Sequence, residues 1–303
     1  MNILITGGSG YLGGILVKYL QQNHNIGLLT RRPISYFDNI LEEIIIDFNN
    51  PTPVRLSHQY DLFIHIAGAN EIDSQDYQTA LNGSALSTRI CIDICNKNNI
   101  QKFIYFSTFH VYGKSSGEIL PSTPINCLND YAITHFFAEE YVKMAKKQFD
   151  IDYIIFRLSN IYGAPIHAFI DRWEIVPNCF CKEAFETKQI TLRSSGKQHR
   201  DFLSINQLLF TLKHYIQSFS NNANKIINCA SGTSRTIFDI ATITKQVYET
   251  RYNTKCTINV LSQHPTESAH LIIDNNDIQL IIPTSNNEFQ TAINEIFCVL
   301  DSK

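Results

Sequence analysis

A glycine-rich segment near the start of the chain has the spacing of a phosphate-binding turn. Residues 6–13 read Thr-Gly-Gly-Ser-Gly-Tyr-Leu-Gly and follow directly on an apolar run. Glycines with this spacing allow a tight turn, a close approach of the backbone to a pyrophosphate and a close contact between helix and strand. A helix beginning there would add N-terminal amides and the positive end of its dipole. We therefore expect a dinucleotide to bind at Gly7, Ser9, Gly10, Tyr11, Leu12 and Gly13.

The end of the second apolar run indicates which dinucleotide is preferred. Sites specific for NAD carry an acidic residue there, which binds the hydroxyls of the adenosine ribose. Here the run ends in Arg31 and Arg32, whose guanidinium groups suit a 2′-phosphate. The pattern predicts NADP in preference to NAD, unless one arginine only stacks on the adenine and the preference is loose. Asp47, just after the third run, is placed to receive the adenine amino group.

The elements that must position these residues alternate between short apolar runs and longer helical stretches. The runs lack polar alternation, as strands buried on both faces do, and lie at Asn2–Thr6, Ile26–Thr30, Glu43–Ile46, Asp61–Ile66, Lys102–Ser107 and Tyr153–Arg157. Helices are predicted between them at Tyr11–Asn23, Asp76–Asn98 and Asp130–Phe149. This alternation predicts an α/β fold with a doubly wound, Rossmann-type parallel sheet.

The pattern changes after residue 163. A strand and helix follow at 202–219, and further elements are predicted at Lys225–Cys229, Ile237–Arg251 and Cys256–Val260. Because no Pro/Gly/Ser-rich linker separates the two parts, we expect interleaved domains. A Rossmann domain would comprise residues 1–163 and 200–230. A smaller α+β domain that binds the substrate would comprise residues 164–199 and 231–303.

Composition excludes several classes of protein. With 303 residues, 44% of them hydrophobic, the chain is long and apolar enough to bury a core. A net charge of −3 argues against binding to nucleic acid or to an anionic membrane. The eight cysteines show neither C-x-x-C pairs nor zinc spacing, so we expect no metal site and a reduced, cytoplasmic protein. The first residues enter an apolar run without the pattern of a leader sequence, and no apolar run reaches about 18 residues, so we expect neither a leader nor a spanning helix.

A series of short motifs stands along the chain in a recognisable order. They lie at residues 6–13, 61–69 (Asp-Leu-Phe-Ile-His-Ile-Ala-Gly-Ala), 82 (Asn), 106–113 (Phe-Ser-Thr-Phe-His-Val-Tyr-Gly), 131–135 (Tyr-Ala-Ile-Thr-His), 157–163 (Arg-Leu-Ser-Asn-Ile-Tyr-Gly) and 198–202 (Gln-His-Arg-Asp-Phe). In this order and spacing the chain resembles, over nearly its whole length, the extended short-chain dehydrogenase/reductase family, especially its nucleotide-sugar epimerases, dehydratases and reductases.

The resemblance implies a hydride passed between a nicotinamide and a sugar carbon. Tyr131 matches the tyrosine that moves the hydroxyl proton, and Thr108 matches the residue that hydrogen-bonds the same oxygen. Asn160 and Arg200 match positions that hold the diphosphate of a nucleotide-sugar. Ala67 falls in the motif that contacts the cofactor.

One position departs from the family motif Tyr-x-x-x-Lys, because the fourth residue after Tyr131 is His135. The lysine of the family holds the nicotinamide ribose and lowers the pKa of the tyrosine by its positive charge. A histidine with the reference pKa of ~6.5 is only about a quarter protonated at pH 7. It could reach the ribose through water, but it activates a tyrosine less well. The alternative is an inactive descendant that still binds cofactor.

The residues after Thr108 discriminate between reactions. Sugar 4,6-dehydratases of the family carry an Asp-Glu pair there, whereas this chain has Phe109 and His110, and phenylalanine cannot transfer a proton. Enzymes similar to GDP-fucose synthase place an acid/base cysteine at the position of His110 and a histidine near His167. Histidine suits proton transfer near neutral pH, although both residues could simply be polar residues near the domain boundary.

These observations favour an NADP-dependent keto-sugar reductase that acts on a nucleotide-linked sugar in surface polysaccharide or glycoconjugate synthesis. A nucleotide-sugar 4-epimerase is the next candidate, with NAD as the other possible cofactor. The third candidate is a protein that binds cofactor and nucleotide-sugar without turnover. By analogy with the family, we expect a homodimer that forms through the helices predicted at residues 76–98 and 130–149.

Overall fold

The structure is a computed structural model that describes residues 1–170, 172–261, 269–282 and 287–302. The chain forms two compact units. The first unit comprises Met1–Gly113, Pro124–Arg157 and Gln217–Ile227, and the second comprises Lys114–Thr123, Leu158–Ile216 and Asn228–Lys303.

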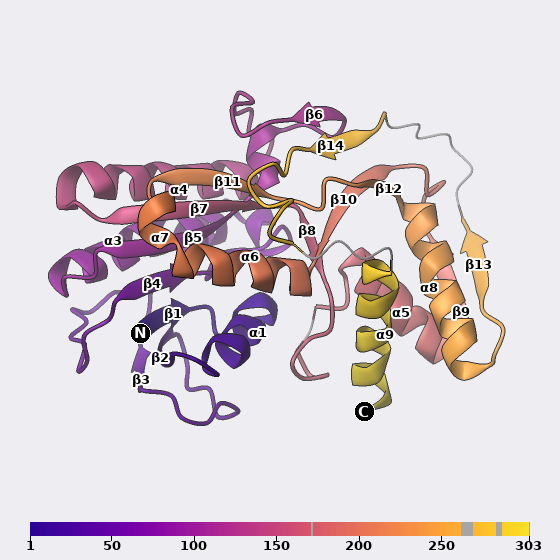
Figure 1. The fold of residues 1–303 in the computed structure, drawn as a ribbon, viewed down its shortest axis with the longest axis horizontal. Helices are drawn as coiled ribbons and strands as arrows, with labels where there is room; N and C mark the ends of the chain where they lie inside the picture. The colour runs from indigo at the N-terminus through magenta and orange to yellow at the C-terminus, as the bar shows by residue number, and fades with distance from the viewer. Residues whose placement is uncertain (171, 262–268, 283–286, 303) are drawn as a thin grey trace. The chain divides into compact units, whose positions relative to one another are not determined.

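A seven-stranded sheet dominates the first unit, in the order β11-β7-β5-β4-β1-β2-β3 (Figure 1). Its strands are β1 Asn2–Thr6, β2 Asn25–Thr30, β3 Glu42–Ile45, β4 Leu62–His65, β5 Lys102–Thr108, β7 Asp152–Leu158 and β11 Lys225–Cys229. The pairs β1–β2, β2–β3, β1–β4 and β4–β5 are parallel. The strand order reverses between β1 and β4, which is where such sheets bind ligands at their carboxyl edge. The predicted α/β, Rossmann-type fold is confirmed.

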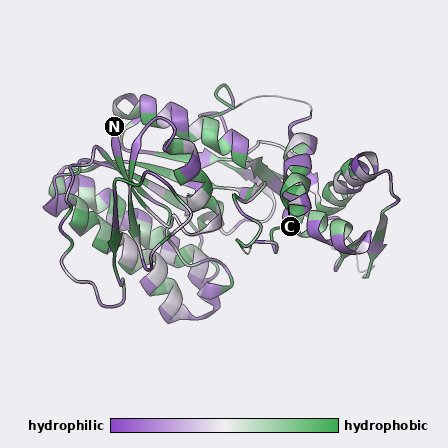
Figure 2. Ribbon diagram, turned by 90° about the horizontal axis from the view of Figure 1, so that it is seen from below, coloured by the Kyte–Doolittle hydropathy of each residue, from purple (hydrophilic) through white to green (hydrophobic). Residues whose placement is uncertain are grey.

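The strands form this sheet because their side chains are apolar on both faces. Ile3, Leu4 and Ile5 of β1 are completely buried, as are Phe63 and Ile64 of β4. Figure 2 shows hydrophobic colour along the strands of the large sheet and a mixture of hydrophilic and hydrophobic colour on the helices beside it. Such helices bury one apolar stripe and leave the opposite face to water.

The helices of the first unit connect the strands and carry several of the candidate residues. They are α1 Tyr11–Leu20, η1 Asp73–Gln75, α2 Tyr77–Ala80, η2 Leu81–Leu86, α3 Ser87–Lys97, η3 Phe109–Tyr112, α4 Asp130–Phe149 and α7 Phe219–Asn222. Residues of α3 and α4 pack in one hydrophobic cluster with residues of β4 and β5. The Asn129 side chain caps α4 by accepting from the amide of Ala132, and α4 ends at Asp150 in the left-handed conformation.

The helix predicted over Asp76–Asn98 is present from Tyr77 to Lys97, but it contains a π-helical turn that the sequence pattern did not predict. The segment is divided into α2, a π-helical turn (η2) and α3. Small residues let the loop after β4 approach this turn closely, because a Cβ atom on Gly83 would lie 3.1 Å from the Cβ of Ala69. The wide turn lets the loop after β4 pass close to the helix backbone, and π-helical turns of this kind often lie at functional sites.

The second unit contains smaller sheets and a separate hydrophobic core. Its sheets have the strand orders β12-β10-β8, β13-β9 and β14-β6. Residues of α5, α8 and α9 pack together in one hydrophobic cluster. The strands are β6 Gly117–Ile119, β8 Asn160–Tyr162, β9 Gln189–Leu192, β10 His199–Ser204, β12 Ser234–Thr236, β13 Thr257–Val260 and β14 Leu271–Ile273. The helices are α5 Val176–Thr187, α6 Ile205–Gln217, α8 Ile237–Tyr252 and α9 Glu288–Asp301.

The boundaries of the two compact units differ from those of the expected domains. Residues 114–123, 158–163, 200–216 and 228–230 were expected in the Rossmann domain but belong to the second unit. The chain passes between the units several times. The functional assignment of each domain stays a prediction. No helix in the described ranges is both long enough and apolar enough to cross a membrane.

Candidate active site

The predicted phosphate-binding turn joins β1 to α1 in a conformation that needs its glycines. Gly7 has a φ of +75°, and its carbonyl accepts from the amide of Gly10 at 2.9 Å. A Cβ atom on Gly13 would lie 2.0 Å from the carbonyl oxygen of Gly7, so only glycine fits there. The helix α1 begins at Tyr11 with no side-chain cap and no acidic residue in its first turn. Its first amides can therefore bind a phosphate, and the residues present fit the pyrophosphate of a dinucleotide.

The loop after β4 lies directly against this turn. The amides of Ile66 and Ala67 donate to the Thr6 hydroxyl at 3.1 and 3.2 Å, and a Cβ atom on Gly7 would lie 2.8 Å from the Ala67 nitrogen. Further along the loop, the Ala69 amide donates to the Ser84 hydroxyl at 3.2 Å. The loop that contains Ala67 is thus held between the glycine turn and η2.

The residues predicted to bind the adenosine lie at the ends of the next strands. Arg31 and Arg32 follow β2 with exposed side chains, and the Thr30 hydroxyl donates to the carbonyl of Arg32 at 2.9 Å. Within the described part of the chain, neither arginine forms an ion pair. Asp47 is exposed two residues after β3, and one of its carboxylate oxygens already accepts from the Asn49 amide at 2.9 Å. The arginines therefore keep their charge for a ligand.

A cluster of aromatic rings lies at the start of α4. The Tyr131 ring is 4.7 Å from that of His135 and 5.7 Å from that of His110, between centroids and edge to face in both cases. The Thr108 hydroxyl, at the carboxyl end of β5, accepts from the His110 amide at 3.2 Å. The structure therefore brings together Thr108, His110, Tyr131 and His135, which the sequence analysis selected from two distant segments.

His110 has an acidic neighbour that sequence reasoning missed. Its Nε2 atom lies 3.4 Å from a carboxylate oxygen of Glu71, in the loop after β4. Both side chains are partly exposed. The carboxylate is within reach of a hydrogen bond from the imidazole, so the two side chains form a donor–acceptor pair, and the His110 ring lies beside that of Tyr131. No sequence signal links Glu71 to His110, because the contact depends on the path of a loop.

His135 is uncharged at neutral pH in this environment. The ring is only 7% exposed, and its Nδ1 atom lies 2.7 Å from the Tyr105 hydroxyl. A Cβ atom on Gly68 would lie 3.3 Å from the ring, which shows how closely the loop covers it. Burial lowers the pKa of His135 to about 4, and a hydrogen bond to the Ala69 backbone opposes this only in part. The expectation of a ring one-quarter protonated at pH 7 is therefore wrong, because desolvation penalises the charged form.

A buried polar row continues behind His135. The Tyr105 ring stacks on His65 at 5.6 Å, and His65 contacts the Thr6 hydroxyl through Nδ1 at 2.7 Å and the Thr88 hydroxyl through Nε2 at 3.0 Å. Burial, with a smaller contribution from His135, lowers the pKa of His65 to about 3. Both imidazoles are neutral and hydrogen-bonded. The row thus holds His135 in one orientation and connects it to the strand that precedes the glycine turn.

A buried ion pair lies one helical turn further along the same face of α4. Glu139, four residues after His135, accepts from Arg157 Nε at 2.9 Å and Nη2 at 2.6 Å, and from the Ser107 hydroxyl at 2.6 Å. The Arg157 guanidinium lies 4.7 Å over the Tyr112 ring, and the pair raises the pKa of Arg157 above its ordinary value. These contacts join α4 to β5 and β7. Sequence reasoning missed Glu139, although its spacing from His135 places it on the same face.

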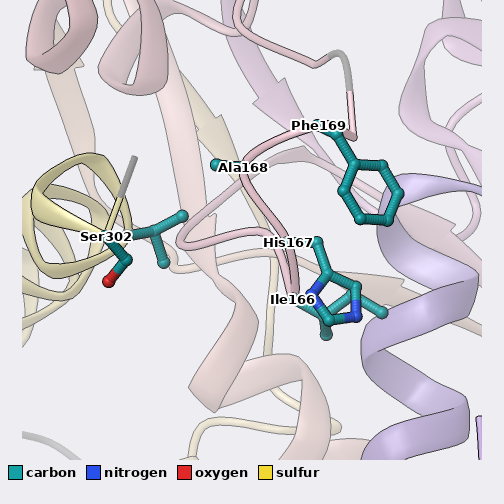
Figure 3. Close-up of a pocket in the computed structure, with 6 residues that line it drawn as sticks. Ile166, His167, Ala168, Phe169 and Ser302 are labelled. Atoms are coloured by element: carbon teal, nitrogen blue, oxygen red, sulfur yellow. The ribbon is translucent and has the colours of Figure 1, made fainter. Parts of the chain in front are cut away.

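The residues expected to bind the nucleotide-sugar lie in the second unit. Asn160 in β8 donates to the carbonyl of Asp201 at 2.7 Å, and Arg200 precedes that residue in β10, which pairs with β8. His167 lines a cavity of about 600 Å³ with Ile166, Ala168, Phe169, Val299 and Ser302 (Figure 3). Its ring stacks on that of Phe169 at 5.0 Å. The roles of these residues stay predictions.

Comparisons with known proteins point to nucleotide-sugar epimerases and dehydratases. The model of the family described as "NAD dependent epimerase/dehydratase family" matches residues 3–230. The chain is 27% identical over 239 residues to dTDP-D-glucose 4,6-dehydratase of Dictyostelium discoideum, a match that covers 68% of this chain and 53% of that protein. It is 26% identical over 225 residues to a Bacillus subtilis protein described as an uncharacterized UDP-glucose epimerase, covering 68% and 69% of the two chains.

The fold also matches solved structures over the full chain. The crystal structure of UDP-glucuronic acid 4-epimerase from Bacillus cereus in complex with NAD superposes with a TM-score of 0.82 and 20% sequence identity. The match covers 100% of this chain and 99% of that one. At this identity the likeness establishes the fold.

Proposed function

Because this chain belongs to the NAD dependent epimerase/dehydratase family, we propose that it transfers a hydride between a nicotinamide dinucleotide and a carbon of a nucleotide-linked sugar. The observation that carries the proposal is the common position of the glycine turn and the Tyr131 cluster. The turn follows β1, the loop with Ala67 follows β4, and Thr108 ends β5. Since these strands are parallel neighbours, all three segments lie at one edge of the sheet.

The residues of the cluster divide the proton chemistry between them. The bound cofactor would supply or accept the hydride. Tyr131 would carry the hydroxyl proton of the sugar, and Thr108 would hydrogen-bond the same oxygen. His110, with Glu71 beside it, would be a second group that donates or accepts a proton. His135 would remain a neutral ring beside Tyr131 and would lie next to the nicotinamide ribose of the cofactor.

The neutral state of His135 favours reduction of a keto-sugar as the principal reaction. A reduction needs Tyr131 in its protonated form. A tyrosine with the reference pKa of ~10 is protonated at neutral pH, and an uncharged neighbour does not lower that pKa. An oxidation needs the same tyrosine deprotonated, without the help of a fixed positive charge. The product would then serve polysaccharide or glycoconjugate synthesis.

A 4-epimerase is the second candidate, favoured by the 26% identity to the Bacillus subtilis protein described as an epimerase. Epimerisation requires oxidation of the sugar and then reduction at the same carbon. Of these two steps, we expect the oxidation to be the slower with a neutral His135, because oxidation needs Tyr131 deprotonated. Elimination of water fits less well despite the likeness to a dehydratase. Phe109, buried to 4% exposure, stands where that reaction needs a proton donor.

A thermal-shift screen tests this proposal without assuming turnover. We expect NADP, NAD and at least one of the UDP-, GDP-, dTDP- and CDP-sugars to raise the midpoint of unfolding, because a ligand that binds only the folded state stabilises it. NADP should raise the midpoint more than NAD, through Arg31 and Arg32. The double variant Arg31→Ala/Arg32→Ala should lose this difference, and Arg55→Ala, an exposed arginine elsewhere in the unit, should keep it. No shift with any nucleotide-sugar would contradict the proposed substrate class.

We also propose that the protein forms a homodimer through α4 and its neighbouring helices. Ile133, Phe137 and Tyr141 recur at four-residue spacing on a face of α4 different from that of Tyr131 and His135, and they are 37%, 43% and 36% exposed. Two further exposed apolar residues, Leu81 and Leu86, lie on η2. Such a stripe is typical of a helix that packs on a second copy. Sedimentation equilibrium should give twice the chain mass for the natural protein and a monomer for Phe137→Glu. A monomeric natural protein would contradict the proposal.

A further inference from the structure

Two arginines face each other across the small sheet of the second unit. Arg200 of β10 and Arg235 of β12 are direct partners in the antiparallel pairing. Directly opposed residues of such a pair point to the same face, with Cβ atoms roughly 5 Å apart, and like charges in that position repel. An anion between the two guanidinium groups would relieve this repulsion.

Neutral groups hold both side chains in place. An Nη atom of Arg200 donates to the carbonyl of His199 at 2.9 Å. The Arg235 guanidinium lies 5.5 Å over the ring of Phe289, which itself stacks on Tyr162 at 4.6 Å. Over the residues that the structure describes, neither guanidinium is paired with a carboxylate. Both arginines are half-buried, so their positive charge is fixed in position and left for a ligand.

The backbone around Arg235 is fixed on both sides. The completely buried carboxylate of Asp201 accepts from the amide and hydroxyl of Ser231, both at 2.9 Å, and from the amide of Thr233 at 3.2 Å. These bonds fold the segment before β12 back onto β10. Directly after Arg235, Thr236 and Asp239 form a capping box that begins α8. The position of Arg235 opposite Arg200 is thus built into the fold.

We propose that Arg235, together with Arg200, binds the diphosphate of the nucleotide-linked substrate. The proposal rests on the proposed function and adds to it a residue that the sequence motifs do not mark. A diphosphate presents several oxygens and about two negative charges, which two guanidinium groups can bind through charge-assisted, bidentate hydrogen bonds.

Calorimetric titration with nucleotides tests the role of Arg235. The probe is whichever of UDP, GDP, dTDP and CDP binds the natural protein most tightly, with the corresponding monophosphate as comparison. Arg235→Ala should weaken binding of the diphosphate roughly tenfold or more, the effect of losing hydrogen bonds to a charged group. Arg235→Lys, which keeps the charge but not the fork of donors, should lie between. Arg193→Ala, an exposed arginine of the same unit, should change affinity less than about twofold.

The possible outcomes distinguish a wrong substrate class from a wrong role of Arg235. If no nucleoside diphosphate binds the natural protein, the proposed substrate class fails. If one binds and Arg235→Ala and Arg235→Lys leave its affinity unchanged, the role of Arg235 is wrong and the proposed function stands. If Arg235→Ala weakens a UDP-uronic acid but not UDP, the arginine recognises a sugar carboxylate, and its assignment to the diphosphate is overturned. An unchanged unfolding midpoint of the unliganded variants shows that they are folded.

Discussion

Oxidation of the nucleotide-linked sugar at pH 7 should become about tenfold faster, or more, when His135 is replaced by lysine. An opposite charge within about 4–6 Å shifts a pKa by one or more units, and each unit changes the deprotonated fraction of a tyrosine tenfold at neutral pH. In the natural protein burial lowers the pKa of His135 to about 4, so no charge stands at this position. A lysine would favour tyrosinate, which is the form that oxidation requires.

The direction of this effect can be checked against matched variants. The ionisable groups near Tyr131 include His110, which contacts Glu71, and the buried Tyr105, and His135→Lys leaves these residues in place. His135→Gln, which is neutral, should not accelerate oxidation. Tyr131→Phe should remove most of the activity in both directions. Equal oxidation rates at pH 7 for the natural protein, His135→Lys and His135→Gln would show that charge at position 135 is irrelevant.

Glu139→Gln should reduce the free energy of unfolding by about 3–5 kcal/mol, the cost of breaking a buried ion pair from one side. The Glu139 side chain is completely buried and that of Arg157 is 3% exposed. The variant leaves a buried guanidinium without its counter-charge, and it replaces one of the two acceptor oxygens of Glu139 with an NH2 group that can only donate. Urea-induced unfolding measures the change.

The neighbouring residue provides the control for this variant. Glu140 lies next to Glu139 on α4 but is half-exposed, and it pairs with Lys143 on the surface. Glu140→Gln should cost less than about 1 kcal/mol. Replacing both partners, as in Glu139→Gln/Arg157→Met, should cost less than the sum of the single changes, because no unpaired charge remains. Similar losses for Glu139→Gln and Glu140→Gln would contradict the importance of the buried pair.

Local sequence patterns were sufficient to predict most of the central sheet. The predicted bounds of Asn2–Thr6, Asp130–Phe149 and Lys225–Cys229 agree with β1, α4 and β11. Two helices of the second unit were missed. The apolar residues of α9 do recur at helical spacing, so a signal was present there. The buried face of α5 includes the polar Asn178 and begins with a proline, which obscures the pattern.

The location of the candidate site was more predictable than its electrostatics. The glycine turn and the Tyr131 segment stand out as motifs, because their chemistry depends on local spacing. The charge state of His135 depends on Tyr105 and Gly68, which come from other strands and loops and exclude water from the ring. The contacts of Glu71 with His110 and of Arg235 with Arg200 likewise arise from chain packing. A single sequence indicates which segments are buried, but it does not indicate which distant side chains cover or contact a given residue.

The pH–rate profile of oxidation by the natural protein tests the central claim, that Tyr131 carries the proton beside an uncharged partner. The initial rate of cofactor reduction would be followed with a nucleotide-sugar that the screen identifies, from about pH 6.5 to 9.5. The rate should rise steadily toward alkaline pH, as expected for a tyrosine with a reference pKa of ~10, and the rise should move to lower pH in His135→Lys. A profile already flat across this range in the natural protein would mean that another group activates Tyr131, or that Tyr131 is not the proton carrier.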